Sequence, residues 1–323
     1  MLRITRVGPA FGLLLAACAC VATPASAQDY PQRPVSIILS TAAGSSPDVI
    51  TRVVADTLSR PWKQQVLVIN RPGASGVIAA RAAASAPADG YSLFMAVSSA
   101  FTVLPESKTK LPVDLDVDFV PIGLVADQPM MFAVSSRLGV GTLAELIALA
   151  KSRPDEILFG ASRLSVPHMT GELLNQRAGI KLGYVPTLGG AKVAQDVMNG
   201  SLQVYVDSVP AVAGALQDGA LKALAVAWDR RLDNFPDVPL VSETLPGFQA
   251  KGWYVLLAPA NTPAPILSKL RADLHVALND AELRKRLLDL GTFARPLSIE
   301  QTAAYIRAER DLWRPIVRAI GVE

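Results

Sequence analysis

Residues 35–48 read Val35-Ser36-Ile37-Ile38-Leu39-Ser40-Thr41-Ala42-Ala43-Gly44-Ser45-Ser46-Pro47-Asp48. The apolar run at 35–39 is typical of a buried strand, and the small residues after it form a loop that opens a helix. Ser46 can be the N-cap of that helix and Pro47 its first residue, while Gly44 lets the backbone approach a ligand. This strand–loop–helix unit is the one from which α/β folds are built.

The same alternation continues along the chain. We expect strands at 35–39, 66–69, 93–97, 131–134, 157–160, 182–185, 202–206, 221–227 and 253–258. Helices are expected between them at 47–60, 75–86, 142–152, 167–178, 190–199 and 210–218, followed by three in succession at 264–279, 280–290 and 298–319. The pattern predicts parallel sheets with helices on both faces.

The 323 residues are enough for about two domains. No repeat or flexible linker divides the chain, so we expect it to cross between the domains through strands, near 123–129 and near 251–255. The predicted first domain comprises residues 28–126 and 252–323, and the predicted second domain comprises residues 127–251.

Residues 1–27 have the pattern of a secretory signal peptide. Arg3 and Arg6 precede a mostly apolar stretch, and Ala25-Ser26-Ala27 fits ordinary cleavage after Ala27. The run Leu15-Ala16-Ala17-Cys18 resembles a lipoprotein box, so lipid anchoring at Cys18 is the alternative. Both routes cross the inner membrane, and the predicted location is the periplasm.

Composition excludes several classes of protein. Half of the residues are hydrophobic and 18% are charged, which excludes a disordered chain. With 31 Lys and Arg against 28 Asp and Glu and no basic cluster, the sequence argues against nucleic-acid binding. Cys18 and Cys20 both lie in the leader, and His168 and His275 are far apart, so we expect no disulfide, no metal site and no cofactor.

Catalytic motifs are missing from the sequence. It has no G-x-S-x-G elbow and no P-loop. The run Gly139-Val140-Gly141-Thr142-Leu143-Ala144 matches a dinucleotide pattern, but no acidic residue follows at the required spacing and a capped helix entry explains both glycines. We therefore predict no catalytic residues, and a periplasmic hydrolase or isomerase using a serine, His168 and an aspartate is kept as an alternative.

Three further junctions repeat the first one. Ser98-Ser99 follows the strand at 93–97, residues 161–168 follow the strand at 157–160, and residues 186–191 follow Val185. Each junction exposes backbone N–H groups at the positive end of a helix, where an anion binds. One such helix end contributes only about 0.3–1 kcal/mol. Several converging on one cleft could hold a carboxylate, although any α/β protein has such loops.

Four side chains near these junctions allow more than one interpretation. His168 is a ligand contact, a general base or a packing residue. Asp48 either complements a helix dipole or binds a ligand amine or hydroxyl, and Asp207, at a strand end, faces the cleft or caps an N–H group. Arg163 either holds a carboxylate bidentately or lies on the surface.

Longer motifs resemble those of the Bug family of periplasmic solute-binding proteins, receptors related to tripartite tricarboxylate transport. The matches include Asn70-Arg71-Pro72-Gly73-Ala74, Asp89-Gly90-Tyr91, His168-Met169-Thr170-Gly171-Glu172, Pro236-Asp237-Val238-Pro239 and Leu257-Ala258-Pro259-Ala260-Asn261-Thr262-Pro263. They occur in the family's order from Tyr30 to Gly321. The resemblance implies a type II periplasmic binding fold, in which two α/β domains close on a small carboxylate.

The resemblance also implies a set of ligand-binding residues. Carried over by position they are Thr41, Ala43, Gly44, Ser45 and Asp48 in the first loop, Thr187, Gly189, Gly190 and Ala191 in the second, and Ser98, Ser99, Ser165, His168 and Asp207 elsewhere. Two departures stand out, since Ala43-Gly44-Ser45 replaces the family's usual Pro-Gly-Gly, and Thr187-Leu188 replaces an aromatic and a basic residue. Arg163 is added to the set as a replacement for the missing charge.

The predicted function is therefore an extracytoplasmic receptor, not an enzyme, for a small organic acid such as a carboxylate, a dicarboxylate or an amino acid. The predicted partners are the membrane subunits of a tripartite tricarboxylate-type transporter, with a two-component sensor kinase as the alternative. We expect a monomer.

Overall fold

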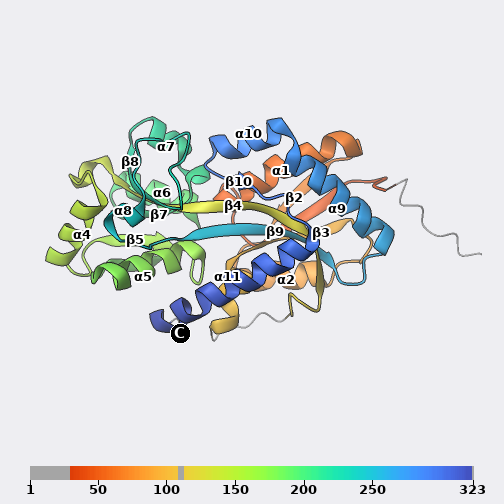
Figure 1. Cartoon of the computed structure of the whole chain (residues 1–323), viewed down its shortest axis with the longest axis horizontal. Coiled ribbons are helices and arrows are strands. Elements are labelled where there is room, and N and C mark those ends of the chain that lie inside the picture. The colour runs from red at the N-terminus through yellow and green to blue at the C-terminus, as the bar shows by residue number, and fades with distance from the viewer. Residues whose placement is uncertain (1–29, 108–112, 322–323) are drawn as a thin grey trace, which may run out of the picture.

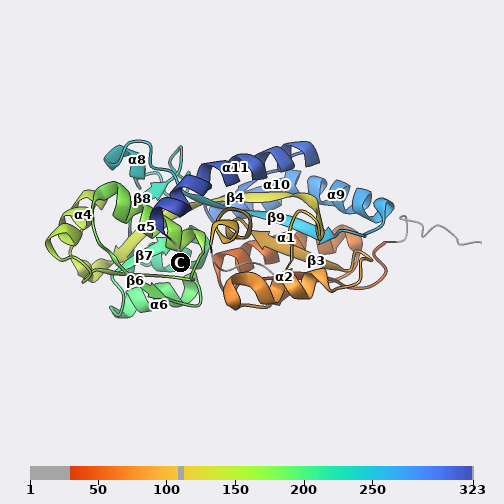
Figure 2. The same cartoon turned by 90° about the horizontal axis from the view of Figure 1, so that it is seen from below.

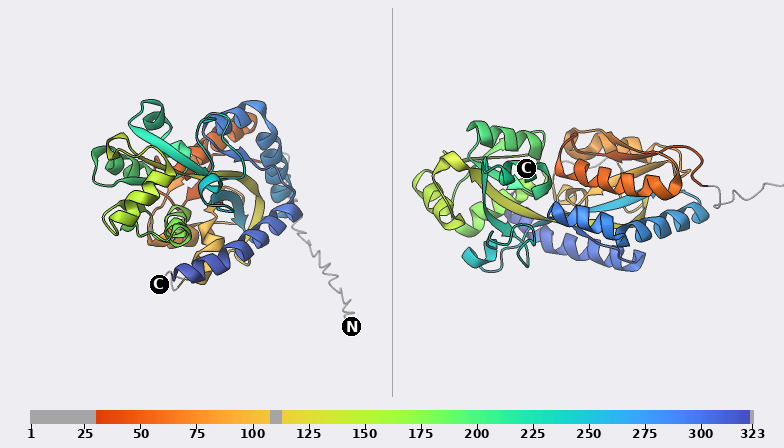
Figure 3. Two further views of the ribbon diagram at one scale, coloured as in Figure 1. Left: turned by 60° about the vertical axis from the view of Figure 1, so that its left-hand side comes forward. Right: turned by 90° about the horizontal axis from the view of Figure 1, so that it is seen from above.

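The computed structural model describes residues 30–107 and 113–321, and it consists of two α/β lobes placed side by side (Figure 1; Figure 3, right). The predicted leader, its cleavage site and Cys18 lie outside the described residues. Within the described ranges, no helix has the length and apolar character needed to cross a membrane.

The first lobe is built on a mixed sheet. Its strand order is β2 (Val66–Asn70), β1 (Val35–Leu39), β3 (Ser92–Val97), β9 (Lys251–Pro259) and β4 (Phe119–Ser135), with β10 (Phe293–Ala294) beside β4. One face packs on α1 (Ser46–Trp62), α9 (Ala264–Asn279) and α10 (Ala281–Asp289), and the other on α2 (Val77–Ala84), α3 (Ser99–Thr102) and part of α11 (Ile299–Ile320). The apolar stripe Leu267, Leu270, Leu274 and Leu278 of α9 is buried in the first of these layers.

The second lobe continues the sheet. The end of β4 pairs with β7 (Val204–Asp207) and β8 (Leu221–Ala227), and β5 (Leu158–Ala161) lies parallel to β7 and β6 (Gly183–Pro186). Its helices are α4 (Leu143–Ser152), α5 (Val166–Ala178), α6 (Gly190–Asn199), α7 (Ala213–Gln217) and α8 (Val241–Thr244). Parallel strands with helices on both faces place the carboxyl ends of β5, β6 and β7 at one edge of this sheet.

Two long strands join the lobes. β4 pairs with β9 as far as Pro129, opposite Lys251, and from Met130 onward it pairs with strands of the second lobe. The change of pairing partner falls between Pro129 and Met130 on β4 and at Lys251 on β9. The boundaries at 126/127 and 251/252 are retained as our proposal for where one domain ends and the other begins.

The last helix also contacts both lobes (Figure 2). Ile306 of α11 packs in the first lobe, whereas Trp313 and Val317 pack in the core of the second. Glu309, between them, accepts a hydrogen bond from the Trp253 indole at 3.2 Å and pairs with Lys251 at 2.9 Å. α11 is thus attached to β9 at the crossing, and its end belongs structurally to the second lobe.

The predicted elements differ from the observed ones in a few places. The expected strand at 131–134 is only the end of β4, which runs through Pro121, Gly123 and Pro129. Its pairing with β9 is irregular near Pro121 and Leu124, which is how the strand accommodates residues that normally interrupt one. The helix expected at 210–218 is split into a 3-10 turn at Val209–Ala211 and α7, and α3, α8 and β10 were not predicted.

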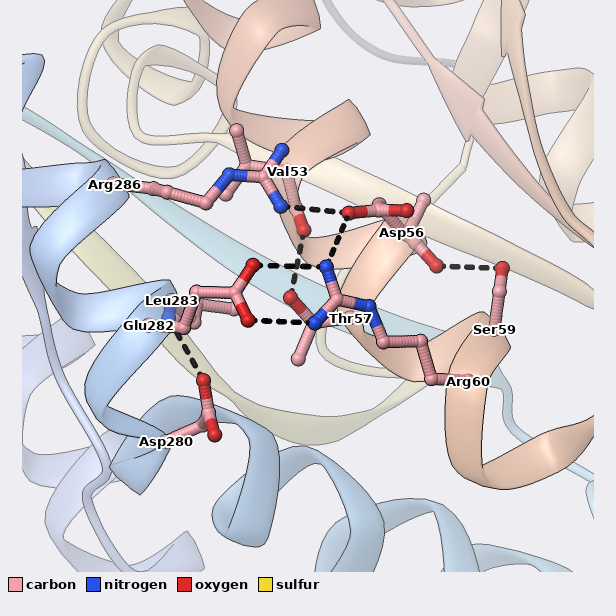
Figure 4. Close-up of polar contacts among 10 residues, drawn as sticks. Val53, Asp56, Thr57, Ser59, Arg60, Asp280, Glu282, Leu283 and Arg286 are labelled. Atoms are coloured by element: carbon pink, nitrogen blue, oxygen red, sulfur yellow. Dashed lines mark hydrogen bonds and ion pairs between the residues drawn. The ribbon is translucent and has the colours of Figure 1, made fainter.

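A group of ion pairs fixes α10 on α1 (Figure 4). The Arg60 guanidinium of α1 donates two hydrogen bonds to Glu282 of α10, at 2.7 and 2.9 Å. Arg286 of α10 donates to Asp56 of α1 at 2.6 Å. Exposed pairs of this kind add little stability individually, but they orient α1, whose first turn faces the other lobe.

Candidate functional site

A cavity of about 250 Å³ lies between the two lobes. The first lobe lines it with Ser40–Ala42, Ser45, Pro47, Pro72–Gly76 and Val97–Ser99, the second with Ser162–Pro167, Thr187–Gly190 and Asp207, and the crossing strands with Gln128, Met130, Gly252 and Tyr254. Each of the four junctions identified in the sequence contributes to this lining. The cavity is below the range of drug-sized pockets, so it suits a small molecule.

Four helices begin at the cavity wall: α1 and α3 from the first lobe, and α5 and α6 from the second. The N-caps of α1, α3 and α6 make no side-chain capping bond; the Ser45 hydroxyl, for example, donates to the Ala42 carbonyl at 2.6 Å instead. The first N–H groups of a helix need partners from outside it. Uncapped helix ends that converge from both lobes form a site for an anion.

The first loop is held in shape from behind the cavity. Asp48 is buried, and its carboxylate accepts hydrogen bonds from the Gly44 amide, the Arg52 side chain and the Asn70 amide, at 2.9–3.0 Å. Burial acts to raise the pKa of Asp48, but the bonds from Arg52, Gly44 and Asn70 outweigh it and lower that pKa. Asp48 is therefore a charged positioning residue that lies directly behind the lining residue Pro47.

The loop before α5 is arranged in a similar way. Arg163 is exposed and lines the cavity, and Leu164 after it has a left-handed backbone with φ +59°. The Leu164 amide donates to His168 Nδ1 at 3.3 Å, and the His168 ring stacks on Tyr184 with 3.8 Å between centroids. His168 thus supports the loop that carries Arg163, and it lies outside the lining.

Burial, together with the nearby charge of Arg163, lowers the pKa of His168 to about 4. The ring is neutral at pH 7, so its approach to the Glu172 carboxylate, 3.9 Å from Nε2, is not an ion pair at that pH. Among residues 30–107 and 113–321, the contact of Nε2 is with this carboxylate, and no serine hydroxyl is hydrogen-bonded to the ring, which argues against His168 as the base of a nucleophilic serine.

This pKa predicts how stability depends on pH. The unfolded chain binds a proton on His168 near pH 6.5 and the folded chain only near pH 4, so stability is lost as the pH falls through that window. Between pH 7 and pH 5 we expect the unfolding free energy to fall by about 1–2 kcal/mol more in the wild type than in His168→Phe. Urea unfolding at both pH values measures this, with exposed His275→Gln as the control. Equal pH dependence in the wild type and His168→Phe would contradict it.

The two lobes touch around the cavity. The Ser75 hydroxyl donates to the Arg163 carbonyl at 3.5 Å. A Cβ added to Gly189 would lie 3.7 Å from Ser45 Cβ, and one added to Gly44 would lie 3.9 Å from Ala191 Cβ. The first and second loops therefore face each other across the gap between the lobes.

The predicted site residues divide into two groups. Those on the cavity lining are Thr41, Ser45, Ser98, Ser99, Arg163, Ser165, Thr187, Gly189, Gly190 and Asp207. Those outside it are Ala43, Gly44, Asp48, His168 and Ala191, which shape the loops or lie where the loops meet. Ligand contact stays a prediction for both groups.

Sequence reasoning missed several lining residues. Ser75 belongs to the segment that begins with the Asn70–Ala74 motif, so the motif was a usable signal. Gln128 and Tyr254 lie inside the crossing strands, where the sequence alone resembles that of core strands. Over residues 30–107 and 113–321, no group of three or more His, Cys, Asp or Glu side chains is placed to hold a metal ion.

Comparison with known proteins identifies close relatives. Residues 50–322 match the family model described as tripartite tricarboxylate transporter family receptor. The protein BugT of Bordetella pertussis is 33% identical over 325 residues, covering 100% of this chain and 99% of BugT. The resemblance noted in the sequence is thereby confirmed.

Solved structures show the same fold. Rpa4515 of R. palustris, solved with adipate, has a TM-score of 0.88 at 28% identity and covers 91% of this chain and 99% of its own. The periplasmic binding protein BugD has a TM-score of 0.86 at 28% identity, with coverage of 91% and 99%. MatC of Rhodopseudomonas palustris, solved with malate, has a TM-score of 0.83 at 29% identity, with coverage of 89% and 100%. The predicted two-domain periplasmic binding fold is confirmed.

Proposed function

The chain belongs to the tripartite tricarboxylate transporter receptor family, and we propose on that premise that the cavity between its lobes binds a small organic acid. It is a periplasmic solute receptor that serves a tripartite transport system. Family membership favours transport over signalling to a sensor kinase.

The observation that carries the ligand class is the convergence of four helix N-termini on one cavity. Three of them have no capping side chain, so their N–H groups are available to an anionic ligand. Arg163 adds a guanidinium to the same wall, and guanidinium groups bind carboxylates in bidentate geometry. The acids bound by Rpa4515 and MatC, adipate and malate, support a carboxylate here as well.

The proposed mechanism is closure around the ligand. β4 and β9 join the lobes, and the loops at Ser45 and Gly189 approach each other from opposite sides. A carboxylate between those loops would add contacts to both lobes at once, so binding favours the closed state. A receptor without bound acid is expected to be more open.

Thermal unfolding of the mature protein tests this proposal. The protein is refolded to remove any carried-over ligand and is then mixed with dicarboxylates, tricarboxylates, amino acids and aromatic acids. A ligand at 100 times its Kd stabilises the folded state by about 2.7 kcal/mol, which corresponds to a shift of about 5–10 °C. At least one acid should give such a shift, and a panel without any shift would contradict the proposal.

We also propose that the leader is removed after Ala27 and that the receptor is a monomer. Ala25-Ser26-Ala27 provides the small residues of an ordinary cleavage site. Mass spectrometry of the exported protein distinguishes a chain that begins at Gln28 from one that begins at a lipidated Cys18. Sedimentation analysis of the same sample gives the oligomeric state.

A further inference from the structure

Asp207 is an acidic residue on the lining of a cavity that otherwise offers hydrogen-bond donors and a positive charge. It is the last residue of β7, and its Oδ1 accepts hydrogen bonds from the Ser208 amide at 2.7 Å and the Ser208 hydroxyl at 3.2 Å. Across the described ranges of the chain, Oδ2 has no hydrogen-bond partner, and no Lys, Arg or His pairs with this carboxylate.

The groups around Asp207 do not neutralise it. Tyr254 of β9, also on the lining, and Tyr205 of β7 are both buried, and the Tyr205 hydroxyl already donates to the Ser208 carbonyl at 2.7 Å. Burial raises the pKa of Asp207 to about 6, although its bonds from Ser208 act in the opposite direction. Asp207 is half-buried, so its carboxylate is charged at neutral pH and only partly hydrated.

A ligand can stabilise this carboxylate. Asp207 is half-buried, and a carboxylate that is partly withdrawn from water is stabilised when a donor or a cation meets it. A second carboxylate placed there would repel it, because two like charges in one site disfavour each other. In the proposed function, the carboxylate of the ligand binds at the helix ends and Arg163. The group that can pair with Asp207 is therefore a hydrogen-bond donor elsewhere on the same ligand.

We propose that Asp207 is the specificity-determining residue of the cavity, and that its Oδ2 accepts a hydrogen bond from an ammonium or hydroxyl group on a carboxylic-acid ligand. This inference rests on the proposed function, since it needs an acid in the cavity. With Asp207 in this role, the cavity selects amino acids or hydroxy acids over unsubstituted acids of the same carbon skeleton.

Two matched series of acids test the inference. The first is succinate, malate and aspartate, and the second is glutarate, 2-hydroxyglutarate and glutamate; within a series the members differ only at one carbon. Calorimetric titration at pH 7.5 measures the dissociation constant of each acid. In at least one series, a substituted acid should bind about 10- to 100-fold more tightly than the unsubstituted acid. Whether the hydroxy or the amino member is preferred distinguishes the two donors.

The variant Asp207→Asn removes the charge and keeps an oxygen for the Ser208 amide. It should remove the preference by weakening the substituted acid and leaving the unsubstituted acid unchanged or tighter. Asp218→Asn, an exposed change in the same lobe that is not on the lining, is the control and should keep the preference. Thermal unfolding without ligand checks that both variants are folded.

The pH dependence supplies an independent readout. The ionised form of Asp207 is the acceptor, so affinity for the substituted acid should fall more steeply as the pH drops through about 6 in the wild type than in Asp207→Asn, where only protonation of the ligand's own carboxylates remains. The other charged or titratable groups facing this part of the cavity are Tyr205, Tyr254 and Arg163. Burial raises the pKa of both tyrosines well above its ordinary value near 10, so neither tyrosine titrates near pH 6.

The outcomes separate this inference from the proposed function. If unsubstituted acids bind as tightly as substituted ones, and Asp207→Asn changes neither, the inference is overturned while the carboxylate receptor stands. Tighter binding at low pH would also overturn it, because a protonated Asp207 would then be donating to the ligand. If no acid of either series or of the wider panel binds, both are overturned together.

Discussion

Gly189→Val is expected to weaken acid binding by at least about 100-fold, equivalent to ~2.8 kcal/mol, because it disturbs several donors at once. Gly189 is the N-cap of α6, with φ +132° and ψ +172°, a region open in practice only to glycine. A valine would force this backbone to rotate and turn away the first N–H groups of α6. Its side chain would also enter the space toward Ser45, 3.7 Å from the added Cβ, and obstruct closure.

Gly200→Val is the matched control for this variant. Gly200 lies at the other end of the same helix, with φ +89° and no atom within 4 Å of an added Cβ. Both variants carry backbone strain of about 1–3 kcal/mol, so both should lose stability. Only Gly189→Val should lose binding in a calorimetric titration. Full affinity in Gly189→Val would remove the second loop from the site.

Arg163→Ala should weaken binding by about 1.5–3 kcal/mol, or roughly 10- to 100-fold, if its guanidinium contacts the bound carboxylate. Arg163 is the positively charged side chain among the residues that line the cavity. Because it is exposed, added salt should reduce its contribution to the binding free energy. Arg163→Lys should recover part of the affinity, since an ammonium keeps the charge and loses the bidentate geometry.

The control for charge alone is Lys192→Ala. Lys192 lies on α6 near the cavity but is not on its lining, and it pairs with Asp196 of the same helix. Its removal should leave the dissociation constant unchanged at moderate salt. An unchanged constant in Arg163→Ala as well would show that Arg163 is a surface residue and that the helix ends alone hold the acid.

Much of the fold could be predicted because its elements are signalled locally. β1 and β8 have the predicted bounds, and α6 and α9 do as well, since apolar periodicity and helix ends mark them directly. β4 could not be predicted in full. Pro121 and Pro129 interrupt its pattern, and only its pairing with β9 and with the strands of the second lobe shows that it continues.

The site was predictable to the level of loops but not of side chains. Ser165 lines the cavity, while His168, three residues later, turns behind it to support Leu164. Both are polar residues at one helix start, and the sequence alone does not distinguish a lining residue from a supporting one. Tyr254 is buried in a strand like its apolar neighbours, and the cavity beside it results from tertiary structure.

The central claim is that the cavity between the lobes recognises a carboxylate through uncapped helix ends and Arg163. The most direct test is calorimetric titration of the stripped mature protein with the strongest acid of the panel and with the primary amide of that acid. The two molecules have nearly the same shape, and the amide lacks the negative charge. We predict that the acid binds and that the amide binds at least about 100-fold more weakly, because charge-assisted bonds are lost. Equal binding of the amide would contradict this account.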